Sequence, residues 1–220
     1  MNDDMSGKPA LRRELLAARR LLSEEDARNA SAVLSRRALE LPEIAEARTV
    51  AAYVSVGGEP GTRALLDALR ERGVRVLLPV LLPDDDLDWA AYEGAERLVP
   101  AGRGLLEPDG ARLGVDAVLQ ARVVLLPGLA VDGRGMRLGR GGGSYDRVLG
   151  RLEKAGAGAA LAVLLYDHEV VGRVPEEPHD RPVHIAVTPG GGGGGGRDGS
   201  APGGGGGGPA GGGPAAPRAA

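Results

Sequence analysis

The stretch Leu126–Leu149, LPGLAVDGRGMRLGRGGGSYDRVL, is the most informative part of this 220-residue chain. It follows a short apolar run, Val123–Leu126, that is typical of a buried strand. An Asp-Gly turn, a second glycine-rich loop and an expected helix start near Tyr145 come next. A strand, a glycine loop and a helix N-terminus often hold a phosphate, because backbone N–H groups and the helix dipole both favour negative charge.

The charged side chains of this stretch indicate what the loop binds. Arg137 and Arg140 flank the glycines, and Asp146 follows them. Cationic donors beside a carboxylate predict a nucleotide phosphate held with a metal ion. The loop is not a P-loop, because no Lys follows Gly143, and it fails the G-x-G-x-x-G pattern at Asp146. The alternative is a glycine-rich hairpin or turn that only needs positive φ angles.

Composition favours a soluble cytoplasmic protein. The chain has no Cys, which excludes disulfides, thiolate metal sites and a Cys nucleophile and fits a reducing compartment. Its net charge of −3 argues against a nucleic-acid surface. No stretch is apolar for the roughly 20 residues that a membrane span needs, and no signal sequence is evident. We therefore expect a cytoplasmic protein that binds no nucleic acid or membrane; separately, we expect a monomer.

Hydrophobic periodicity predicts alternating strands and helices. The expected helices are 8–20, 24–39 with Ser23 as N-cap, 62–72 and 144–152. The expected strands are 49–54, 74–82, 87–93 at an edge, 123–126, 158–165 and 183–187, with 97–108 as a loop. This order predicts an α/β fold with a mostly parallel central sheet flanked by helices. Glu59, Gly128 and Tyr166 each follow a strand, so we expect them to share one cleft.

The chain divides into a single folded domain, 1–189, and a tail, 190–220. The tail holds 17 Gly and four Pro, with three charged residues. Such a composition cannot bury enough apolar surface to offset the entropy of ordering, so we predict a disordered tail.

Several other side chains have both a functional and a structural interpretation. Lys8 and Arg12 share a helix face and can grip a triphosphate, or they form a solvated basic face. Glu59 can bind a polar heterocycle, or it is a carboxylate favoured at a helix N-terminus. Asp146 suits Mg²⁺, or it is a first-turn helix acid or a partner of Arg147. Asp180 suits Mg²⁺ as a second carboxylate, or it forms an exposed ion pair in a loop. The three histidines lack metal-ligand spacing and are expected to be structural or solvent-facing: His168, His179 and His184.

Nearly all of 8–188 resembles the 5-formyltetrahydrofolate cyclo-ligase family, also called methenyltetrahydrofolate synthetases. The resemblance rests on Pro127-Gly128-Leu129-Ala130, on Asp132, and on Arg137-Leu138-Gly139-x-Gly141-x-Gly143-x-Tyr145-Asp146-Arg147. It extends to other motifs along the chain: Lys8-x-x-x-Arg12, Tyr53, Ser55, Glu59, Thr62, Gly104-Leu105-Leu106-Glu107-Pro108, Tyr166-Asp167, Pro175-Glu176, His179-Asp180 and Val187-Thr188.

The resemblance implies a C–N bond-forming ligase with ATP as co-substrate and Mg²⁺ as cofactor. It implies conversion of 5-formyltetrahydrofolate to 5,10-methenyltetrahydrofolate, with release of ADP and phosphate, through an iminium phosphate. Positioning and charge neutralisation carry such phosphoryl transfers. A nucleotide-binding regulatory module and a small-molecule kinase are the alternatives from other functional classes.

The resemblance also implies roles for individual residues. Arg140 and Lys8 take the catalytic roles, and Asp146 and Asp180 match the Mg²⁺ carboxylates. The folate-binding residues are Val54, Glu59, Arg140, Gly143 and Tyr145. The ATP-binding residues are Lys8, Arg12, Arg137, Leu138, Gly139, Arg140, Gly141, Gly142, Gly143, Ser144 and Tyr145.

Three positions depart from the family pattern. Val131 stands where Phe is frequent, and Ser144 where a second Tyr is frequent, so each removes a ring that can stack on a ligand. Glu169 stands where Gln is usual, which affects a polar contact of that loop.

Overall fold

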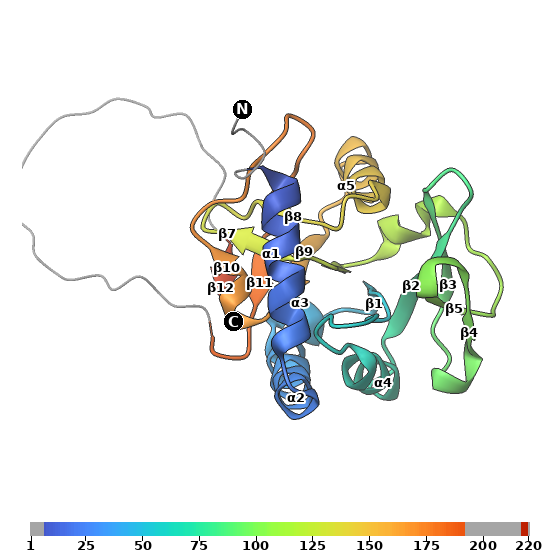
Figure 1. Ribbon diagram of the computed structural model, residues 1–220. Helices are drawn as coiled ribbons and strands as arrows, with labels where there is room; N and C mark the ends of the chain where they lie inside the picture. Colours follow the sequence, from blue (N-terminus) through green and yellow to red (C-terminus); the bar gives the residue numbers. More distant parts are fainter. Residues whose placement is uncertain (1–6, 192–216, 220) are drawn as a thin grey trace, which may run out of the picture.

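The computed structural model describes residues 7–191 and 217–219 and is built around a seven-stranded sheet (Figure 1). The strand order is β12-β11-β9-β6-β1-β2-β3, and all neighbours are parallel except β2 and β3. The bounds are β1 (Thr49–Ala51), β2 (Arg75–Leu81), β3 (Leu87–Ala91), β6 (Val123–Leu126), β9 (Ala160–Leu164), β11 (Ile185–Val187) and β12 (Arg218–Ala219). The predicted α/β fold with a mostly parallel sheet is confirmed.

The predicted helices form, with small differences at their ends. The structure has α1 (Lys8–Leu21), α2 (Glu24–Glu40), α3 (Pro42–Ala45), α4 (Arg63–Glu71) and α5 (Ser144–Lys154). Ser23 caps α2 as expected, because its hydroxyl accepts a hydrogen bond from the Asp26 backbone N–H at 3.0 Å. Thr62 precedes α4 rather than opening it.

The helices cover both faces of the sheet. In Figure 1, α5 lies above the sheet and α2 and α4 lie below it. Strand β6 is buried on both sides, since Val123 and Leu125 pack with α2 and α4 while Val124 and Leu126 pack with α5. Alternate side chains of a strand point to opposite faces, so a continuous apolar run is expected there.

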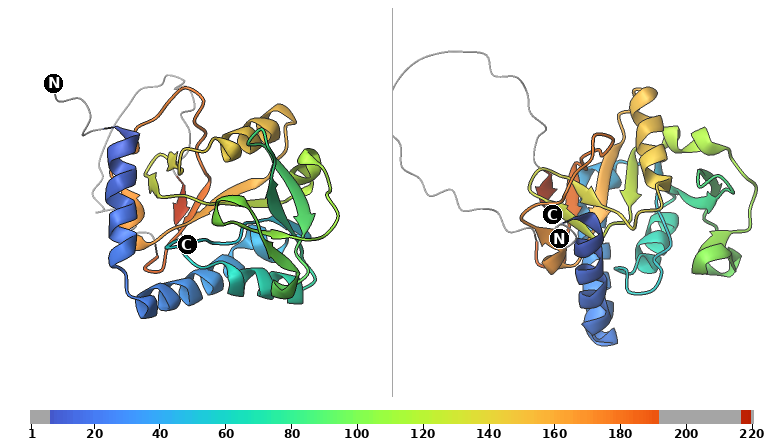
Figure 2. Two further views of the ribbon diagram at one scale, coloured as in Figure 1. Left: turned by 45° about the vertical axis from the view of Figure 1, so that its right-hand side comes forward. Right: turned by 45° about the horizontal axis from the view of Figure 1, so that its top comes forward.

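Helix α1 packs against a second, three-stranded sheet of β10, β7 and β8. This sheet consists of β7 (Ala130–Asp132), β8 (Arg137–Leu138) and β10 (Val170–Val171). Leu15 of α1 packs with Leu129 and Leu138 in a small core of its own. The left view of Figure 2 places α1 along one side of the molecule, with β2 and β3 toward the opposite side.

The interpretation of 97–108 as a loop is wrong. This segment contains an antiparallel hairpin of β4 (Leu98–Pro100) and β5 (Leu106–Pro108). Each strand has three residues and ends in Pro, so neither displays an alternating pattern long enough to detect. The strand expected at 49–54 is also shorter, because beyond Ala52 the chain turns into the loop that leads to Thr62.

The predicted disorder of 190–220 lies mostly outside the described residues. At the described end, Arg218 and Ala219 form β12, which pairs in parallel with Ile185 and Ala186 of β11. Arg218 also forms an ion pair with Glu43 at the start of α3. The prediction is therefore wrong for these two residues, because backbone pairing with a sheet edge needs no apolar side chain.

A search of the described residues for a helix of sufficient length and apolar character to span a bilayer found none.

Candidate active site

One cavity of about 600 Å³ opens where α1, the loop after β1, the β4–β5 hairpin and the start of α5 meet. Every residue predicted to bind ATP, folate or Mg²⁺ lies in its lining. These residues are Lys8, Arg12, Val54, Glu59, Arg137, Leu138, Gly139, Arg140, Gly141, Gly142, Gly143, Ser144, Tyr145, Asp146 and Asp180. Segments far apart in the sequence are thus brought to one site.

The glycine-rich segment contains both a hairpin and a loop that leads into a helix. Residues 130–138 form the β7–β8 hairpin, and the loop 139–143 then leads directly into α5. Gly141 and Gly143 have φ angles of 96° and 75°, which L-residues rarely adopt. A Cβ at Gly141 would lie 3.4 Å from the Arg12 guanidinium carbon, so the loop also approaches α1 closely. The Arg12 Nε–H donates to the Gly139 carbonyl at 2.9 Å.

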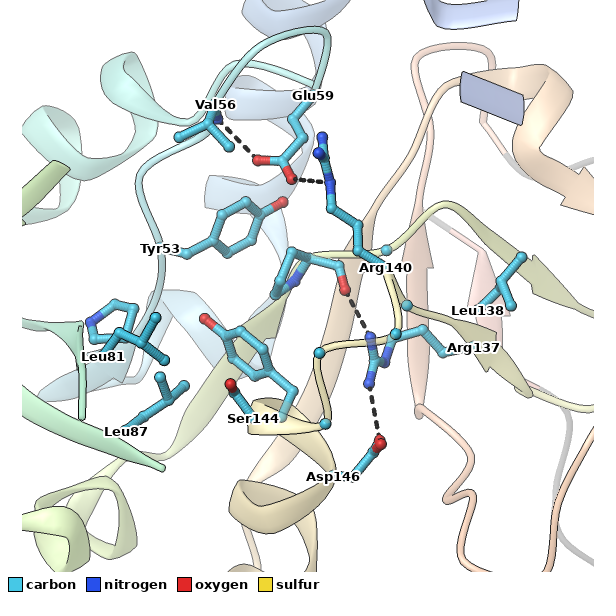
Figure 3. A pocket seen from close by; sticks show the side chains of 18 of the residues that line it. Tyr53, Val56, Glu59, Leu81, Leu87, Arg137, Leu138, Arg140, Ser144 and Asp146 are labelled. Atoms are coloured by element: carbon cyan, nitrogen blue, oxygen red, sulfur yellow. Dashed lines mark hydrogen bonds and ion pairs between the residues drawn. The ribbon is translucent and has the colours of Figure 1, made fainter. Parts of the chain in front are cut away.

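Arg137 lies at the base of the cavity and holds its walls together (Figure 3). Its Nη1 donates to the Pro127 carbonyl at 2.9 Å, and its Nη2 lies 3.6 Å from an Asp146 carboxylate oxygen. Burial lowers the pKa of the Arg137 guanidinium, while the charge of Asp146 opposes that shift. The Arg137 Nε is buried without a hydrogen-bond partner among the described residues.

Lys8 joins the N-terminal end of α1 to the loop before β11. Its ammonium lies 2.6 Å from an Asp180 carboxylate oxygen and 2.7 Å from one of Glu177. Burial lowers the pKa of Lys8, but these hydrogen bonds outweigh it and leave the pKa above its usual value. Burial likewise raises the pKa of Asp180, and the hydrogen bond from Lys8 is the main effect that brings it below its usual value. Glu177, His179 and Asp180 offer ligand atoms within 4.8 Å of one another, a spacing that suits a metal ion.

The loop that carries Glu59 is closed by a reciprocal side-chain pair. The Ser55 backbone N–H donates to the Thr62 hydroxyl at 2.9 Å, and the Thr62 N–H donates to the Ser55 hydroxyl at 3.1 Å. The Thr62 hydroxyl also donates to the Tyr53 carbonyl at 2.8 Å. One Glu59 carboxylate oxygen accepts from the Val56 N–H at 2.9 Å, which fixes the carboxylate inside the cavity.

Glu59 and Arg140 face each other across the cavity (Figure 3). The Arg140 Nε lies 3.2 Å from Glu59 Oε1, and the Glu59 side chain is 7% exposed whereas that of Arg140 is 48% exposed. Tyr53 and Tyr145 lie close by, and burial followed by the charge of Glu59 raises the pKa of both phenols. The Tyr145 hydroxyl is buried without a partner among the described residues, so it is a donor and acceptor available to a ligand.

Sequence reasoning missed the apolar wall of the cavity. In Figure 3, Leu81 and Leu87 lie on the side opposite Arg137 and Leu138. This wall is made by Pro79, Leu81, Leu87, Leu105 and Leu106. These side chains belong to β2, β3 and the β4–β5 hairpin, and nothing in their local pattern distinguishes a cavity wall from the core. Tyr53, Val56, Arg103, Glu107, Pro127, Gly128, Glu177 and His179 complete the lining.

Two further expectations about the site need correction. Tyr166 does not line the cavity with Glu59 and Gly128, because its hydroxyl donates to the Gly58 carbonyl at 3.3 Å behind the Glu59 loop. The expectation that a stacking surface is lost at Val131 finds no support in the cavity lining, because Val131 is buried in the core and is not a lining residue.

Glu169 and the histidines have clear structural surroundings. Glu169 is fully buried and forms an ion pair with Arg19 at 2.6 Å. His184 Nδ1 accepts from the Leu161 N–H, and His168 stacks on Tyr166, so both are structural as expected. His179 is solvent-facing, as expected, but it also lines the cavity. The expectation that it lacks metal-ligand spacing is wrong, because its ring offers a ligand atom within 4.8 Å of those of Glu177 and Asp180.

Comparison with known proteins identifies the family. The model of the 5-formyltetrahydrofolate cyclo-ligase family matches residues 4–189. A 5-formyltetrahydrofolate cyclo-ligase from Mycolicibacterium smegmatis is 46% identical over 147 residues, which cover 64% of this chain and 74% of the relative. The Escherichia coli K12 cyclo-ligase is 34% identical over 173 residues, covering 78% of this chain and 94% of the relative.

Solved structures agree with that family. The NMR structure of a 5,10-methenyltetrahydrofolate synthetase from Aquifex aeolicus aligns with a TM-score of 0.69 at 28% identity, covering 81% of this chain and 88% of that one. A synthetase from Mycoplasma pneumoniae, at 19% identity and a TM-score of 0.65, covers 83% of this chain and 98% of that one and has the same fold. This chain is an enzyme of the 5-formyltetrahydrofolate cyclo-ligase family.

Proposed function

We propose that the protein couples ATP cleavage to cyclisation of 5-formyltetrahydrofolate, giving 5,10-methenyltetrahydrofolate, ADP and phosphate. Family membership supports the folate substrate and the ring closure. The main support for the proposed use of ATP is that one cavity contains both a cationic, glycine-rich region and a separate region around Glu59. Two ligands held side by side in this way can react directly.

The glycine-rich region is the proposed ATP site. Arg12 of α1 contacts the Gly139 carbonyl of the loop 139–143, Lys8 of the same helix also lines the cavity, and Arg137 lies beside the loop. The free N–H groups at the start of α5 favour phosphate oxygens. Phosphate would compete with Asp180 and Glu177 for the Lys8 ammonium. We assign the same role to the remaining loop residues: Leu138, Gly139, Arg140, Gly141, Gly142, Gly143, Ser144 and Tyr145.

The region around Glu59 is the proposed pterin site. The Glu59 carboxylate is nearly buried, and a buried carboxylate is a strong acceptor for the N–H donors of a pterin ring. Val54 contributes an apolar surface, and the unpartnered Tyr145 hydroxyl contributes a polar one. Gly143 and Arg140 border this region from the loop, so they contact both ligands in this proposal.

The chemistry requires one phosphoryl transfer and one ring closure. The formyl oxygen on N5 attacks the γ-phosphorus of ATP, the bond to ADP breaks, and an iminium phosphate forms. N10 then attacks the formyl carbon and loses its proton, and phosphate leaves as the methenyl bridge closes. Arg140 and Lys8 would neutralise charge on the transferred phosphoryl group, which is the main task in this class of reaction.

Asp146 and Asp180 are the proposed Mg²⁺ ligands. Both present carboxylate oxygens to the cavity, which is the donor type that Mg²⁺ prefers beside substrate phosphates. Such an ion would supply charge neutralisation at the phosphate oxygens. Asp146 remains 39% exposed next to Arg137, so its carboxylate is accessible to a ligand.

A continuous absorbance assay for 5,10-methenyltetrahydrofolate tests the proposal. Protein, 5-formyltetrahydrofolate and Mg²⁺ are mixed with and without ATP, and ADP is measured in parallel. We expect product only with ATP, and one ADP for each methenyl group. ATP binding without folate turnover would contradict the proposal and favour a nucleotide-binding module. ADP formation with a stable phosphorylated product would instead favour a small-molecule kinase.

A further inference from the structure

Two residues with a left-handed backbone contact each other, and one of them, Arg103, lines the cavity. Among the described residues, only Asp85 and Arg103 have a positive φ without being glycine, at 66° and 59°. They lie on different loops, yet the Arg103 Nη2 contacts the Asp85 carboxylate at 2.8 Å. Asp adopts this backbone conformation readily in turns, whereas Arg rarely does, and strained residues cluster at functional sites.

Stability does not account for this arrangement. The Arg103 side chain is 64% exposed and that of Asp85 is 43% exposed. An ion pair this open to solvent contributes little to stability, so it does not offset the backbone strain at Arg103. The pair therefore needs an explanation other than folding.

The position of Arg103 supplies that explanation. Asp85 lies in the turn between Leu81 and Leu87, and Arg103 precedes Leu105 on the β4–β5 hairpin. All three leucines line the cavity, as Arg103 itself does. The Glu107 carboxylate accepts a hydrogen bond from the Leu81 N–H at 2.9 Å and fastens the hairpin to β2. The guanidinium thus lies at the outer end of a fixed apolar wall.

The charges nearby leave Arg103 available to an anion. Asp84 lies 3.6 Å from Arg147, and Asp86 lies 2.7 Å from Arg151, so both neighbouring carboxylates have cations of their own. Arg103 makes a single hydrogen bond to the described residues. A guanidinium has five N–H donors in a planar fork, a geometry that matches a second carboxylate.

We propose that Arg103 determines substrate specificity by binding a carboxylate of the glutamate moiety of the folate. This inference rests on the proposed folate site. In the sheet, β2 and β3 lie beyond β1, so the hairpin is farther toward that edge of the molecule than the Glu59 loop (Figure 1). A pterin at Glu59 then directs its benzoyl ring along the leucine wall and its glutamate toward Arg103.

Binding measurements with two ligands test the role of Arg103. Titration calorimetry compares 5-formyltetrahydrofolate with 5-formyltetrahydropteroate, which lacks the glutamate. The variant Arg103→Gly removes the guanidinium and suits the positive φ, so the fold is preserved. We expect its Kd for 5-formyltetrahydrofolate to rise about tenfold, as for loss of a hydrogen-bonded charge at a partly exposed site. The Kd for the pteroate and for ATP should stay unchanged.

Arg97→Ala is the matched control. Arg97 lies on the same segment, pairs with Asp109 at 2.9 Å and does not line the cavity, so this variant should bind both folates normally. An equal loss of both folates in Arg103→Gly, a loss of ATP affinity, or the same effect in Arg97→Ala would overturn the proposal. The proposal would also be overturned if the wild-type protein bound neither 5-formyltetrahydrofolate nor the pteroate, or bound both with the same Kd.

Because binding needs no turnover, the two proposals fail separately. Selective binding of the glutamate moiety without formation of the methenyl product would support the proposed role of Arg103 and contradict the proposed reaction.

Discussion

At the scale of single residues, Glu59 and Arg140 neutralise each other across the cavity. In the proposed reaction each has another task, Glu59 with the pterin and Arg140 with the phosphoryl group. Either ligand must therefore compete with this ion pair. Once a first ligand has broken the ion pair, the second ligand binds without the free-energy cost of breaking it. ATP and folate should therefore bind with positive cooperativity.

The variant Glu59→Gln tests this competition, because it removes the charge and keeps the shape. We expect ATP to bind about twofold to fivefold more tightly without folate, since Arg140 is released from a half-exposed ion pair. Folate should bind about tenfold more weakly, because the pterin loses a charged acceptor. Titration calorimetry with each ligand alone gives both values.

The control for this experiment is Glu107→Gln, which also changes a cavity carboxylate but one bound to the Leu81 N–H rather than to Arg140. It should leave ATP affinity unchanged. If Glu59→Gln weakened ATP and folate together, the ion pair would not be the competitor that we infer.

The residues of the site were predictable to an unequal degree. The charged and glycine positions, such as Arg140 and Gly141, belong to a specific motif, so their chemical role could be predicted from the sequence. Leu87 and Leu105 were not predictable, because an apolar side chain carries no sign of whether it faces a cavity or the core. The strain at Asp85 and Arg103 depends on backbone angles that no local pattern encodes.

At the scale of elements, helix α1 is attached to the sheet by a buried ion pair. Arg19 and Glu169 are 2% and 0% exposed, and the same guanidinium donates to the Gly128 carbonyl at 2.6 Å. The other Glu169 oxygen accepts from the Tyr166 N–H at 3.0 Å. Because α1 also carries Lys8 and Arg12, this pair fixes the helix that presents both cations to the cavity.

Removing one partner of this pair should cost more than removing both charges. We expect Arg19→Met to lower the free energy of unfolding by about 3–5 kcal/mol, because it leaves a buried carboxylate without its cation. Adding Glu169→Gln to that variant should restore part of the loss. Urea unfolding of the two single variants and the double variant measures this coupling. Strictly additive losses would contradict it.

The elements that sequence patterns missed are the short ones. Helices such as α2 and α5 display several turns of periodicity, and their caps are also readable. Strands of two or three residues, as in the β4–β5 and β7–β8 hairpins, contain too few side chains to show alternation. They form because tertiary contacts, such as that of Glu107 with β2, hold them in place.

At the scale of the whole molecule, buried carboxylates make stability depend on pH. Asp132 joins the β7–β8 hairpin to the segment before β11, accepting from the backbone N–H groups of Arg134, Met136 and Val174 at 2.9, 3.1 and 3.0 Å. Burial raises the pKa of Asp132, but these bonds and the Arg134 side chain outweigh it and hold the pKa below its usual value. Its contribution is therefore complete above the unfolded-state pKa of about 3.9 and is lost as pH falls through the folded-state pKa.

The variant Asp132→Asn should reveal that contribution. We expect it to lower the free energy of unfolding at pH 7 by about 1–3 kcal/mol, because an amide cannot satisfy all of these donors. The difference from wild type should shrink as the pH falls below about 4. Urea midpoints measured between pH 7 and pH 3 test both statements.

Asp84→Asn serves as the comparison, since Asp84 is 66% exposed and lies 3.6 Å from Arg147. It should change stability little at any of these pH values. A deficit in Asp132→Asn that stayed constant into the acid range would contradict the assignment.

The overall architecture was the most predictable level. Alternating helices and strands with buried apolar runs, such as Val123–Leu126, specify a parallel sheet with two covered faces. The return of Arg218 and Ala219 to the sheet edge was not predictable, because backbone pairing there involves no side-chain pattern.

The Arg19–Glu169 pair also constrains how this sequence can diverge. The two positions are 150 residues apart, yet the residue at one limits which residues the other can tolerate. Loss of Arg19 first would leave the buried Glu169 carboxylate without a cation, and selection would remove most variants of this kind. Change of Glu169 to Gln first also leaves a buried charge without its counter-ion, but the amide oxygen still accepts a hydrogen bond from the guanidinium, so this order costs less. Descendants of this chain should therefore alter position 169 before position 19, so that substitution at the pair follows a fixed historical order.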